Sequence, residues 1–268
     1  MASEAPAASF APAERGTRLR DRVAIVTGGG RGIGRAIALG LAAEGARVAV
    51  LSRTREELDA VVAGARELGA DGLPLVVDCM DGQALKRAVE DAHERFGRLD
   101  ILVNNVGGLV GDVEKLAPLV HDDDLFEQNV FLNLTTAYYA SRAALPHMVD
   151  GGYGRIVNIG SGYATHGGGT IAYSAAKHGI VGLTRSLAYQ VPAEVTVNCL
   201  CPGWTETALL DWAGSGAAEA ARAKAAAQTV QGRVLAPVEL APMATLLAGP
   251  EGAGITGQVI SVDGGYKV

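Results

Sequence analysis

The sequence predicts an α/β fold: a doubly wound, seven-stranded parallel sheet with helices on both faces, in a single domain. Apolar runs rich in β-branched residues alternate along the chain with stretches whose apolar positions follow a helical period. The runs are apolar throughout rather than at every second position, which is typical of parallel strands covered on both faces. Strict alternation of strands and helices then favours the doubly wound architecture.

The expected elements cover nearly the whole chain. The predicted strands are Val23–Thr27, Val48–Leu51, Leu73–Val77, Ile101–Val103, Ile156–Ile159, Val195–Leu200 and Val259–Val262. Helical periodicity lies between them, in stretches such as Ile33–Ala43, Glu56–Leu68 and Leu85–Phe96. Residues 1–20 are rich in Ala and Pro, and we expect them to form a flexible tail before a domain of residues 21–268. This tail lacks a basic start followed by an apolar block, so it does not resemble a secretory signal.

The composition argues against several classes of partner. Lys and Arg number 23 against 29 Asp and Glu, a formal charge of −6, which disfavours a nucleic-acid or anionic-membrane surface. No apolar run reaches the roughly 20 residues that a membrane span needs. The three cysteines, Cys79, Cys199 and Cys201, lie in or beside apolar runs. We expect them to be reduced and buried, as in a cytoplasmic protein.

We expect no metal site. The five histidines show no close ligand pairing, and Cys199 and Cys201 fit one core-facing side of a strand. The run HDDD at 121–124 fits a solvated helix start, where acidic residues suit the helix dipole.

A glycine-rich segment, VAIVTGGGRGIGRAIALGLAAEG, joins the first predicted strand to the first helix and contains Gly28, Gly32 and Gly34. Glycine permits positive φ in a tight turn and lets backbone N–H groups approach a pyrophosphate. The helix that follows adds partial positive charge at its N-terminus. A strand before the glycines and an amphipathic helix after them predict a dinucleotide site.

This segment and five later motifs together resemble the short-chain dehydrogenase/reductase family over residues 21–268. The motifs are NNVG at 104–107, Ser161, YSAAK at 173–177, PGWTET at 202–207 and VDGG at 262–265. The resemblance implies a Rossmann-type fold, a ketoreductase-like activity and a homotetramer or homodimer. One departure is Val106, since the family usually has alanine there.

The end of the second strand bears on the choice of dinucleotide. NAD-dependent relatives place a carboxylate there to bind the ribose hydroxyls, whereas this chain has Ser52 followed by Arg53, with Arg31 in the glycine segment. Two guanidinium groups can bind a 2′-phosphate, which predicts NADP(H). The alternative is that both arginines are ordinary surface charges.

The resemblance implies further dinucleotide contacts. Asp78 would meet the adenine amino group, Asn104 would hold the loop beneath the cofactor, and Thr207 would hold the carboxamide. The other implied contacts are Gly30, Ile33, Cys79, Asn105, Val106, Gly107, Pro202, Gly203 and Thr205.

Tyr173 and Lys177 lie one helical turn apart, so both can face one cleft. A nearby ammonium, together with the positively charged nicotinamide of an oxidised complex, would lower the pKa of the phenol, which could then serve as acid and base. The resemblance implies that Lys177 also binds the nicotinamide ribose and that Ser161 orients the substrate. It further implies that Asn129, with Asn133 close by, completes a proton relay.

The expected substrate is a small carbonyl or alcohol compound. Tyr163 and His166 lie between Ser161 and Tyr173, and a helical lid is expected at about 208–232. Trp204 and Trp212 suggest an apolar or ring-bearing ketone. The open alternatives are a 3-ketoacyl reductase acting on an acyl-carrier or CoA substrate, an NAD-dependent diol dehydrogenase, and a non-catalytic dinucleotide-binding sensor.

Overall fold

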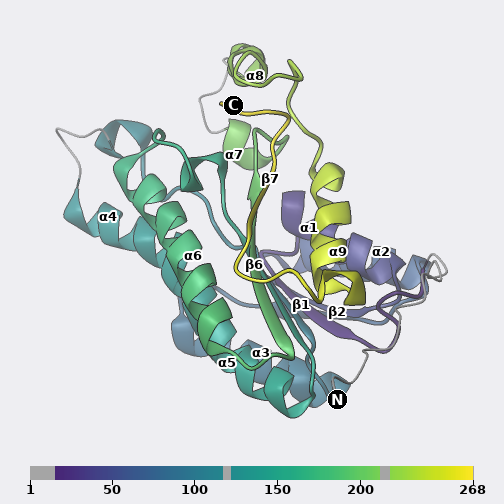
Figure 1. The fold of residues 1–268 in the computed structure, drawn as a ribbon. Helices are drawn as coiled ribbons and strands as arrows, with labels where there is room; N and C mark the ends of the chain where they lie inside the picture. Colours follow the sequence, from purple (N-terminus) through teal and green to yellow (C-terminus); the bar gives the residue numbers. More distant parts are fainter. Residues whose placement is uncertain (1–15, 117–121, 212–217, 268) are drawn as a thin grey trace, which may run out of the picture.

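The computed structural model describes residues 16–116, 122–211 and 218–267, and its centre is one seven-stranded sheet (Figure 1). The strand order is β3-β2-β1-β4-β5-β6-β7, and every neighbouring pair is parallel. The strands are β1 (Val23–Thr27), β2 (Arg47–Ser52), β3 (Gly72–Val76), β4 (Ile101–Asn104), β5 (Gly154–Ile159), β6 (Val195–Pro202) and β7 (Val259–Val262). The predicted fold class is confirmed.

Helices cover both faces of the sheet (Figure 1). The α-helices of the described residues are α1 (Gly32–Ala43), α2 (Arg55–Glu67), α3 (Gly82–Phe96), α4 (Asp123–Val130), α5 (Thr136–Asp150), α6 (Ile171–Gln190), α7 (Ala208–Asp211), α8 (Ala218–Ala226) and α9 (Ala241–Ala248). Helices α1, α2 and α9 pack on one face, and α3, α5 and α6 pack on the other. A π-helical turn, Phe131–Thr135, joins α4 to α5.

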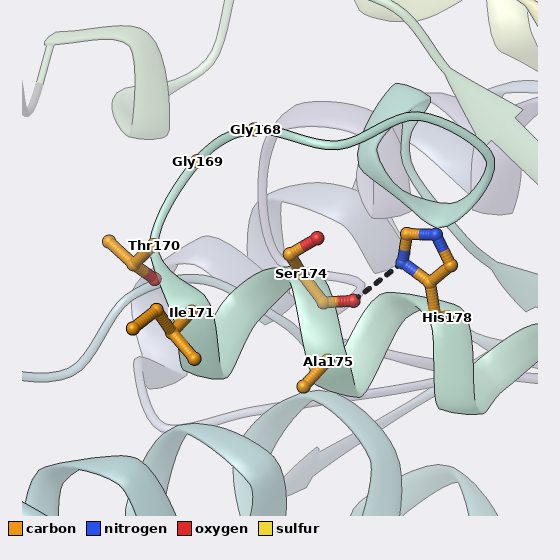
Figure 2. Close-up of a pocket in the computed structure, with 7 residues that line it drawn as sticks. All are labelled: Gly168, Gly169, Thr170, Ile171, Ser174, Ala175 and His178. Atoms are coloured by element: carbon orange, nitrogen blue, oxygen red, sulfur yellow. Dashed lines mark hydrogen bonds between the residues drawn. The ribbon is translucent and has the colours of Figure 1, made fainter. Parts of the chain in front are cut away.

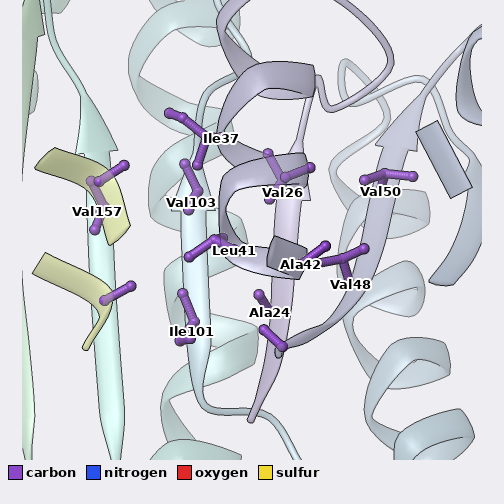
Figure 3. Close-up of a cluster of buried hydrophobic side chains, with 14 of the residues drawn as sticks. Ala24, Val26, Ile37, Leu41, Ala42, Val48, Val50, Ile101, Val103 and Val157 are labelled. Carbon is purple, nitrogen blue, oxygen red and sulfur yellow. The ribbon is translucent and has the colours of Figure 1, made fainter. Parts of the chain in front are cut away.

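Strand β1 shows why its residues are apolar throughout. Ala24 and Val26 belong to the core beneath α1, where Ile37 and Leu41 lie over them (Figure 3). Val23 and Ile25 point to the opposite core, beneath α3 and α5. Successive side chains of a strand alternate between the faces, so a sheet covered on both sides needs apolar residues at every position.

The strand order places the ligand crevice. From β1 the chain proceeds outward to β3 on one side, and from β4 outward to β7 on the other. The two directions part between β1 and β4, and ligands of such sheets bind outside the carboxyl ends of the strands at this point. The segments that follow β1, β4, β5 and β6 therefore converge on the candidate site.

The N-terminal boundary differs from the expected one. Leu19 is fully buried, its N–H donates to the carbonyl oxygen of Glu44 over 2.8 Å, and Arg18 forms an ion pair with Glu44. Residues 16–20 therefore belong to the domain, because burying Leu19 ties them to the end of α1. Residues 1–15 of the expected tail lie outside the described residues.

Element boundaries agree with the expected ones to within two residues, except that α3 begins three residues earlier, at Gly82. Its start is set by Asp81, whose side chain accepts hydrogen bonds from the N–H groups of Gln83 and Ala84. Asp122 caps α4 in the same way, in agreement with the expected solvated helix start at 121–124; His121 itself lies outside the described residues. Within the described ranges, none of the helices combines the length and the apolarity needed to cross a bilayer.

Candidate active site

The glycine segment forms an open cradle between β1 and α1. Gly28 and Gly32 adopt φ values of 63° and 54°, in the left-handed region that favours glycine. A Cβ on Gly34 would lie 2.3 Å from the carbonyl oxygen of Gly28, so only glycine fits there. The side chain of the N-cap residue Arg31 makes no capping hydrogen bond to α1. The first N–H groups of α1 can therefore face an anion.

The loop after β4 is fastened to this cradle by Asn105. Its side-chain Nδ2 donates to the carbonyl oxygens of Thr27 and Gly28 over 3.0 and 3.1 Å. Asn104, expected to hold this loop, instead donates to Ser141 Oγ and Asn158 Oδ1 over 2.9 and 2.8 Å. The expectation was wrong because side chains alternate along a strand, which turns Asn104 toward β5 and α5 and leaves the loop to Asn105.

Two of the other residues expected to contact the dinucleotide, Thr207 and Val106, lie against the glycine segment. A Cβ on Gly32 would lie 3.3 Å from Thr207 Cγ2, so the segment after β6 meets the glycine segment. Val106 packs against Gly28. Ile33 and Gly203 are half-buried, and Thr205 is buried and donates to the Gly203 carbonyl oxygen over 3.0 Å. Pro202 ends β6, Cys79 is buried, and Asp78 is exposed.

A carboxylate that the sequence reasoning missed lies at the end of β2. A Cβ on Gly30 would lie 2.9 Å from Ser52 Oγ and 3.1 Å from Glu57 Oε2. Glu57 Oε1 is 3.9 Å from Arg31 Nη1. Arg53 is exposed at the same end of the strand. The sequence carried one signal for this carboxylate, because Glu57 lies in the first turn of the helix that follows the second strand.

These features fit a nicotinamide dinucleotide. The cradle holds glycines where a Cβ would collide, an uncapped helix N-terminus faces it, and basic side chains lie at the end of β2. The backbone N–H groups of the helix N-terminus and the basic side chains are the donors expected of a site that binds a pyrophosphate.

The catalytic candidates Ser161, Tyr173 and Lys177 meet beside this cradle. Ser161 follows β5, while Tyr173 and Lys177 lie on α6. Lys177 is only 3% exposed, and its Nζ donates to the carbonyl oxygen of Ile159 over 2.9 Å. The same Nζ lies 5.6 Å from the centroid of the Tyr173 ring.

The pKa of Tyr173 departs from the sequence expectation. Burial raises it to about 12, and a hydrogen bond with the Ser161 side chain only partly opposes this. The Lys177 ammonium alone does not produce the expected lowering, because burial destabilises the phenolate more than its protein neighbours stabilise it. Burial also lowers the pKa of Lys177 to about 8, against the opposing effect of Cys199 and Cys201.

Two buried asparagines bind the backbone of the loop beyond Gly107. Asn129 Nδ2 donates to the carbonyl oxygens of Val110 and Leu125, and its Oδ1 accepts from Val110 N. Asn133 is bonded in the same manner to Gly108, and its Nδ2 also donates to the Asn129 carbonyl oxygen over 2.9 Å. A Cβ on Gly107 would lie 2.8 Å from Asn133 Oδ1 and 3.1 Å from Lys177 Nζ. Asn133, rather than Asn129, is therefore the asparagine beside Lys177.

Aromatic side chains form one wall next to Tyr173. The ring of Tyr163 meets those of Tyr173, Trp204 and Tyr266 edge to face, with centroids 6.4, 6.2 and 6.1 Å apart. Tyr266 is buried, and its ring also meets that of His166 at 6.1 Å. Sequence reasoning missed Tyr266, which reaches the site only because the segment after β7 returns to it. Trp212 lies outside the described residues.

A shallow cavity of about 340 Å³ lies at the start of α6 (Figure 2). It adjoins the wall, since a Cβ on Gly168 would lie 2.7 Å from the Tyr163 ring. It is lined by Gly168, Gly169, Thr170, Ile171, Ser174, Ala175 and His178. His178 Nδ1 lies 2.9 Å from the Ser174 carbonyl oxygen. Tyr173 does not line this cavity, which therefore adjoins the catalytic group without containing it.

Cys199 and Cys201 lie behind Ser161, and their sulfur atoms are 3.7 Å apart. A Cβ on the neighbouring Gly160 would lie 2.7 and 2.6 Å from them, so the two thiols fill one side of β6. Among the residues described, there is no group of three or more His, Cys, Asp or Glu side chains that could hold a metal ion.

Comparisons with known proteins agree with this geometry. A family model for short chain dehydrogenase matches residues 22–216. The chain is 37% identical over 250 residues to the short-chain reductase protein NovJ of Streptomyces niveus, covering 92% of this chain and 94% of that protein. It is 36% identical over 246 residues to 3-oxoacyl-[acyl-carrier-protein] reductase FabG of Escherichia coli K12, covering 91% and 96%.

A solved structure extends the similarity to three dimensions. A variant of actinorhodin polyketide ketoreductase with NADPH shows 35% identity and a TM-score of 0.82, covering 91% of this chain and 96% of the other. The family model spans most of the chain, and the sheet, the glycine cradle and the Ser161, Tyr173 and Lys177 cluster are all present. The chain therefore belongs to the short-chain dehydrogenase family and is an oxidoreductase of that family.

Proposed function

We propose that the protein is an NADPH-dependent oxidoreductase that interconverts a ketone and a secondary alcohol. The observation that carries this proposal is the meeting of Ser161, Tyr173 and Lys177 beside the glycine cradle. A nicotinamide dinucleotide supplies the hydride when it is bound. The side chains supply orientation and the proton.

In the reducing direction, Tyr173 donates its phenol proton to the carbonyl oxygen. A pKa of about 12 keeps the phenol protonated near neutral pH, which suits a proton donor. Ser161 donates a hydrogen bond to the same oxygen and holds it near the phenol. These two groups place the developing alkoxide where it can accept a proton.

Lys177 returns a proton to Tyr173 after the phenol has donated its own, and it also binds the dinucleotide. An ammonium has three donors, and the Ile159 carbonyl oxygen takes one. The others serve the nicotinamide ribose and the phenolate that forms when Tyr173 loses its proton. The family resemblance assigns the last place in the proton relay to Asn129. The position of Asn133 beside Gly107 and Lys177 supports Asn133 for that role instead. Asn129 would then help to position Asn133, because its carbonyl oxygen accepts a hydrogen bond from Asn133 Nδ2.

Arg31 and Arg53 support the choice of NADP(H) over NAD(H). Both are exposed near Ser52, where NAD-dependent relatives have a carboxylate. The similar actinorhodin polyketide ketoreductase variant was solved with NADPH, which supports this choice.

The substrate that we propose is a freely diffusing, ring-bearing ketone. The wall formed by Tyr163 and Trp204 offers apolar ring surface next to Tyr173, and His166 meets the same cluster through Tyr266. Residues 212–217 of the expected lid lie outside the described residues. The similarity to FabG favours a second candidate, a 3-oxoacyl group on an acyl carrier.

The compartment and the assembly are part of the same proposal. Three free, buried cysteines support a reducing cytoplasm. Exposed apolar side chains on α5 and α6, among them Tyr138 and Ile171, support pairing of these helices in a homodimer or homotetramer.

The test is NADPH oxidation in the presence of cyclic, aromatic and carrier-bound ketones, followed by NADPH absorbance. We expect turnover with free cyclic or aromatic ketones and little with the carrier-bound series. If NADPH binds but no ketone is reduced, the non-catalytic sensor is the better interpretation. Faster oxidation of alcohols with NAD⁺ would favour the diol dehydrogenase.

A further inference from the structure

The end of β2 carries an acidic group that reaches it from another element. Ser52 occupies the strand end, and the carboxylate of Glu57 approaches Gly30 from the first turn of α2. Because Ser52 Oγ and Glu57 Oε2 both lie about 3 Å from the same point on Gly30, they border one small space. A negative side chain is favourable in this first turn, where the helix dipole supports it.

The same carboxylate faces a guanidinium that the dinucleotide would need. Glu57 Oε1 lies 3.9 Å from Arg31 Nη1, and the Glu57 side chain is 32% exposed against 68% for Arg31. The more buried partner is thus the acidic one, fixed by α2, while the arginine is the freer of the two. Arg53, at the end of β2, has no such carboxylate among the ion pairs of the described residues.

We propose that Glu57 sets the cofactor specificity of this site by weakening its preference for a 2′-phosphate. A 2′-phosphate carries nearly two negative charges, so it competes with Glu57 for Arg31 and is repelled by the carboxylate. An unphosphorylated ribose meets no such repulsion, and Glu57 can accept hydrogen bonds from its hydroxyl groups. The inference rests on the proposed NADP(H) site and narrows it: NADPH is preferred by a smaller factor than Arg31 and Arg53 alone would produce.

The adenosine end can be tested without the nicotinamide. Binding of 2′,5′-ADP and of 5′-AMP is measured by isothermal titration calorimetry for the wild type, Glu57→Gln and Glu56→Gln. Glu56 lies next to Glu57 in the same helix turn and is exposed, so Glu56→Gln removes the same charge outside the space beside Gly30. Thermal unfolding of each variant confirms that it is folded.

We expect Glu57→Gln to tighten 2′,5′-ADP binding by about five- to tenfold, as the loss of one like charge at a partly exposed site should. Binding of 5′-AMP should stay the same or weaken, and Glu56→Gln should change either ligand by less than about twofold. Unchanged or weaker binding of 2′,5′-ADP to Glu57→Gln overturns the inference; weaker binding would mean that Glu57 orients Arg31 toward the phosphate.

The NADP(H) proposal is tested by a different comparison, that of the two ligands binding to the wild type. If the wild type binds 5′-AMP as tightly as 2′,5′-ADP, the arginines do not select the phosphate. The difference between Glu57→Gln and the wild type still measures the effect of Glu57 in that case.

Discussion

At the scale of single residues, Tyr173 carries the proton and should be separable from dinucleotide binding. Tyr173→Phe removes only the phenol oxygen, so it should abolish nearly all ketone reduction and leave NADPH binding almost unchanged. General acid catalysis of this kind contributes about 10²–10⁴-fold, and steady-state kinetics with NADPH titrations would measure both quantities. Tyr163→Phe serves as the matched control. Retention of more than about a tenth of wild-type kcat by Tyr173→Phe would contradict the assignment.

Lys177 should set the alkaline limit of ketone reduction. Tyr173, with a pKa of about 12, stays protonated across the neutral range, whereas Lys177, with a pKa of about 8, loses its proton first. The kcat for reduction should therefore fall as the pH rises through about 8, and a pH–rate profile would measure it.

Lys177→Arg offers a check on this assignment. A guanidinium stays charged at every pH of interest, so the residual kcat of the variant should no longer fall as the pH rises through about 8. If the fall of kcat at alkaline pH persists unchanged in Lys177→Arg, another group causes it.

Lys177 should also make folding stability rise with alkaline pH. Its pKa in the folded protein, about 8, lies below the ordinary lysine value of 10.5 that applies to the unfolded chain. Between these pH values the unfolded state holds more protons, so the free energy of unfolding increases across that window. Tyr173 acts in the opposite direction above the ordinary tyrosine pKa of 10.0, since burial raises its pKa in the folded protein to about 12. Chemical denaturation at a series of pH values would measure both effects.

At the scale of elements, the turn from β1 into α1 depends on glycine at position 34. Gly34→Ala places a Cβ 2.3 Å from the Gly28 carbonyl oxygen, so the turn must shift. NADPH affinity should fall by at least about tenfold, equivalent to about 1.4 kcal/mol, in a fluorescence titration. Gly254→Ala is the control, because a Cβ there meets nothing within 4 Å. Equal NADPH affinity in the two variants would contradict the cradle.

The two asparagines between α4 and α5 should differ in their effects. Asn129 and Asn133 both bind loop backbone, but only Asn133 borders Gly107 together with Lys177. Asn133→Ala should lower kcat and shift the alkaline limb set by Lys177. Asn129→Ala should mainly lower the melting temperature, because it leaves the partly buried N–H and carbonyl groups of Val110 unpaired. If Asn129→Ala shifts the alkaline fall of kcat more than Asn133→Ala does, Asn129 is the residue of the proton relay.

Much of the fold was predictable from the sequence, because the strand runs and the glycine spacing reflect local rules. Features that depend on packing were not predictable. Glu57 approaches Gly30 only through the way α2 lies beside α1, and Tyr266 reaches Gly162 only after the segment beyond β7 folds back. The direction of the Tyr173 pKa shift depends on how the surrounding side chains desolvate its phenol, which no spacing of Tyr and Lys reveals.

At the scale of the whole molecule, the exposed apolar side chains of α5 and α6 should be covered by a second copy. Tyr138 and Val149 on α5 and Ile171 on α6 are 40, 41 and 47% exposed. Light scattering at micromolar concentration should give the mass of a dimer or tetramer. Charged substitutions at Tyr138 and Ile171 should reduce that mass, whereas a similar change at Val238, which is 65% exposed and lies outside these helices, should not. A monomeric wild type would refute the expected assembly.

All three cysteines of the chain are free and buried, and burial raises the pKa of Cys79 to about 12. Maleimides and other thiol reagents react with accessible thiolates, so the native protein should be nearly inert toward them. One cysteine placed at Tyr189, which is 92% exposed, would then be the single reactive position. Fluorescent or spin labels could be attached there without removing a native thiol, and label-to-label distances would report how α6 helices from different copies are arranged.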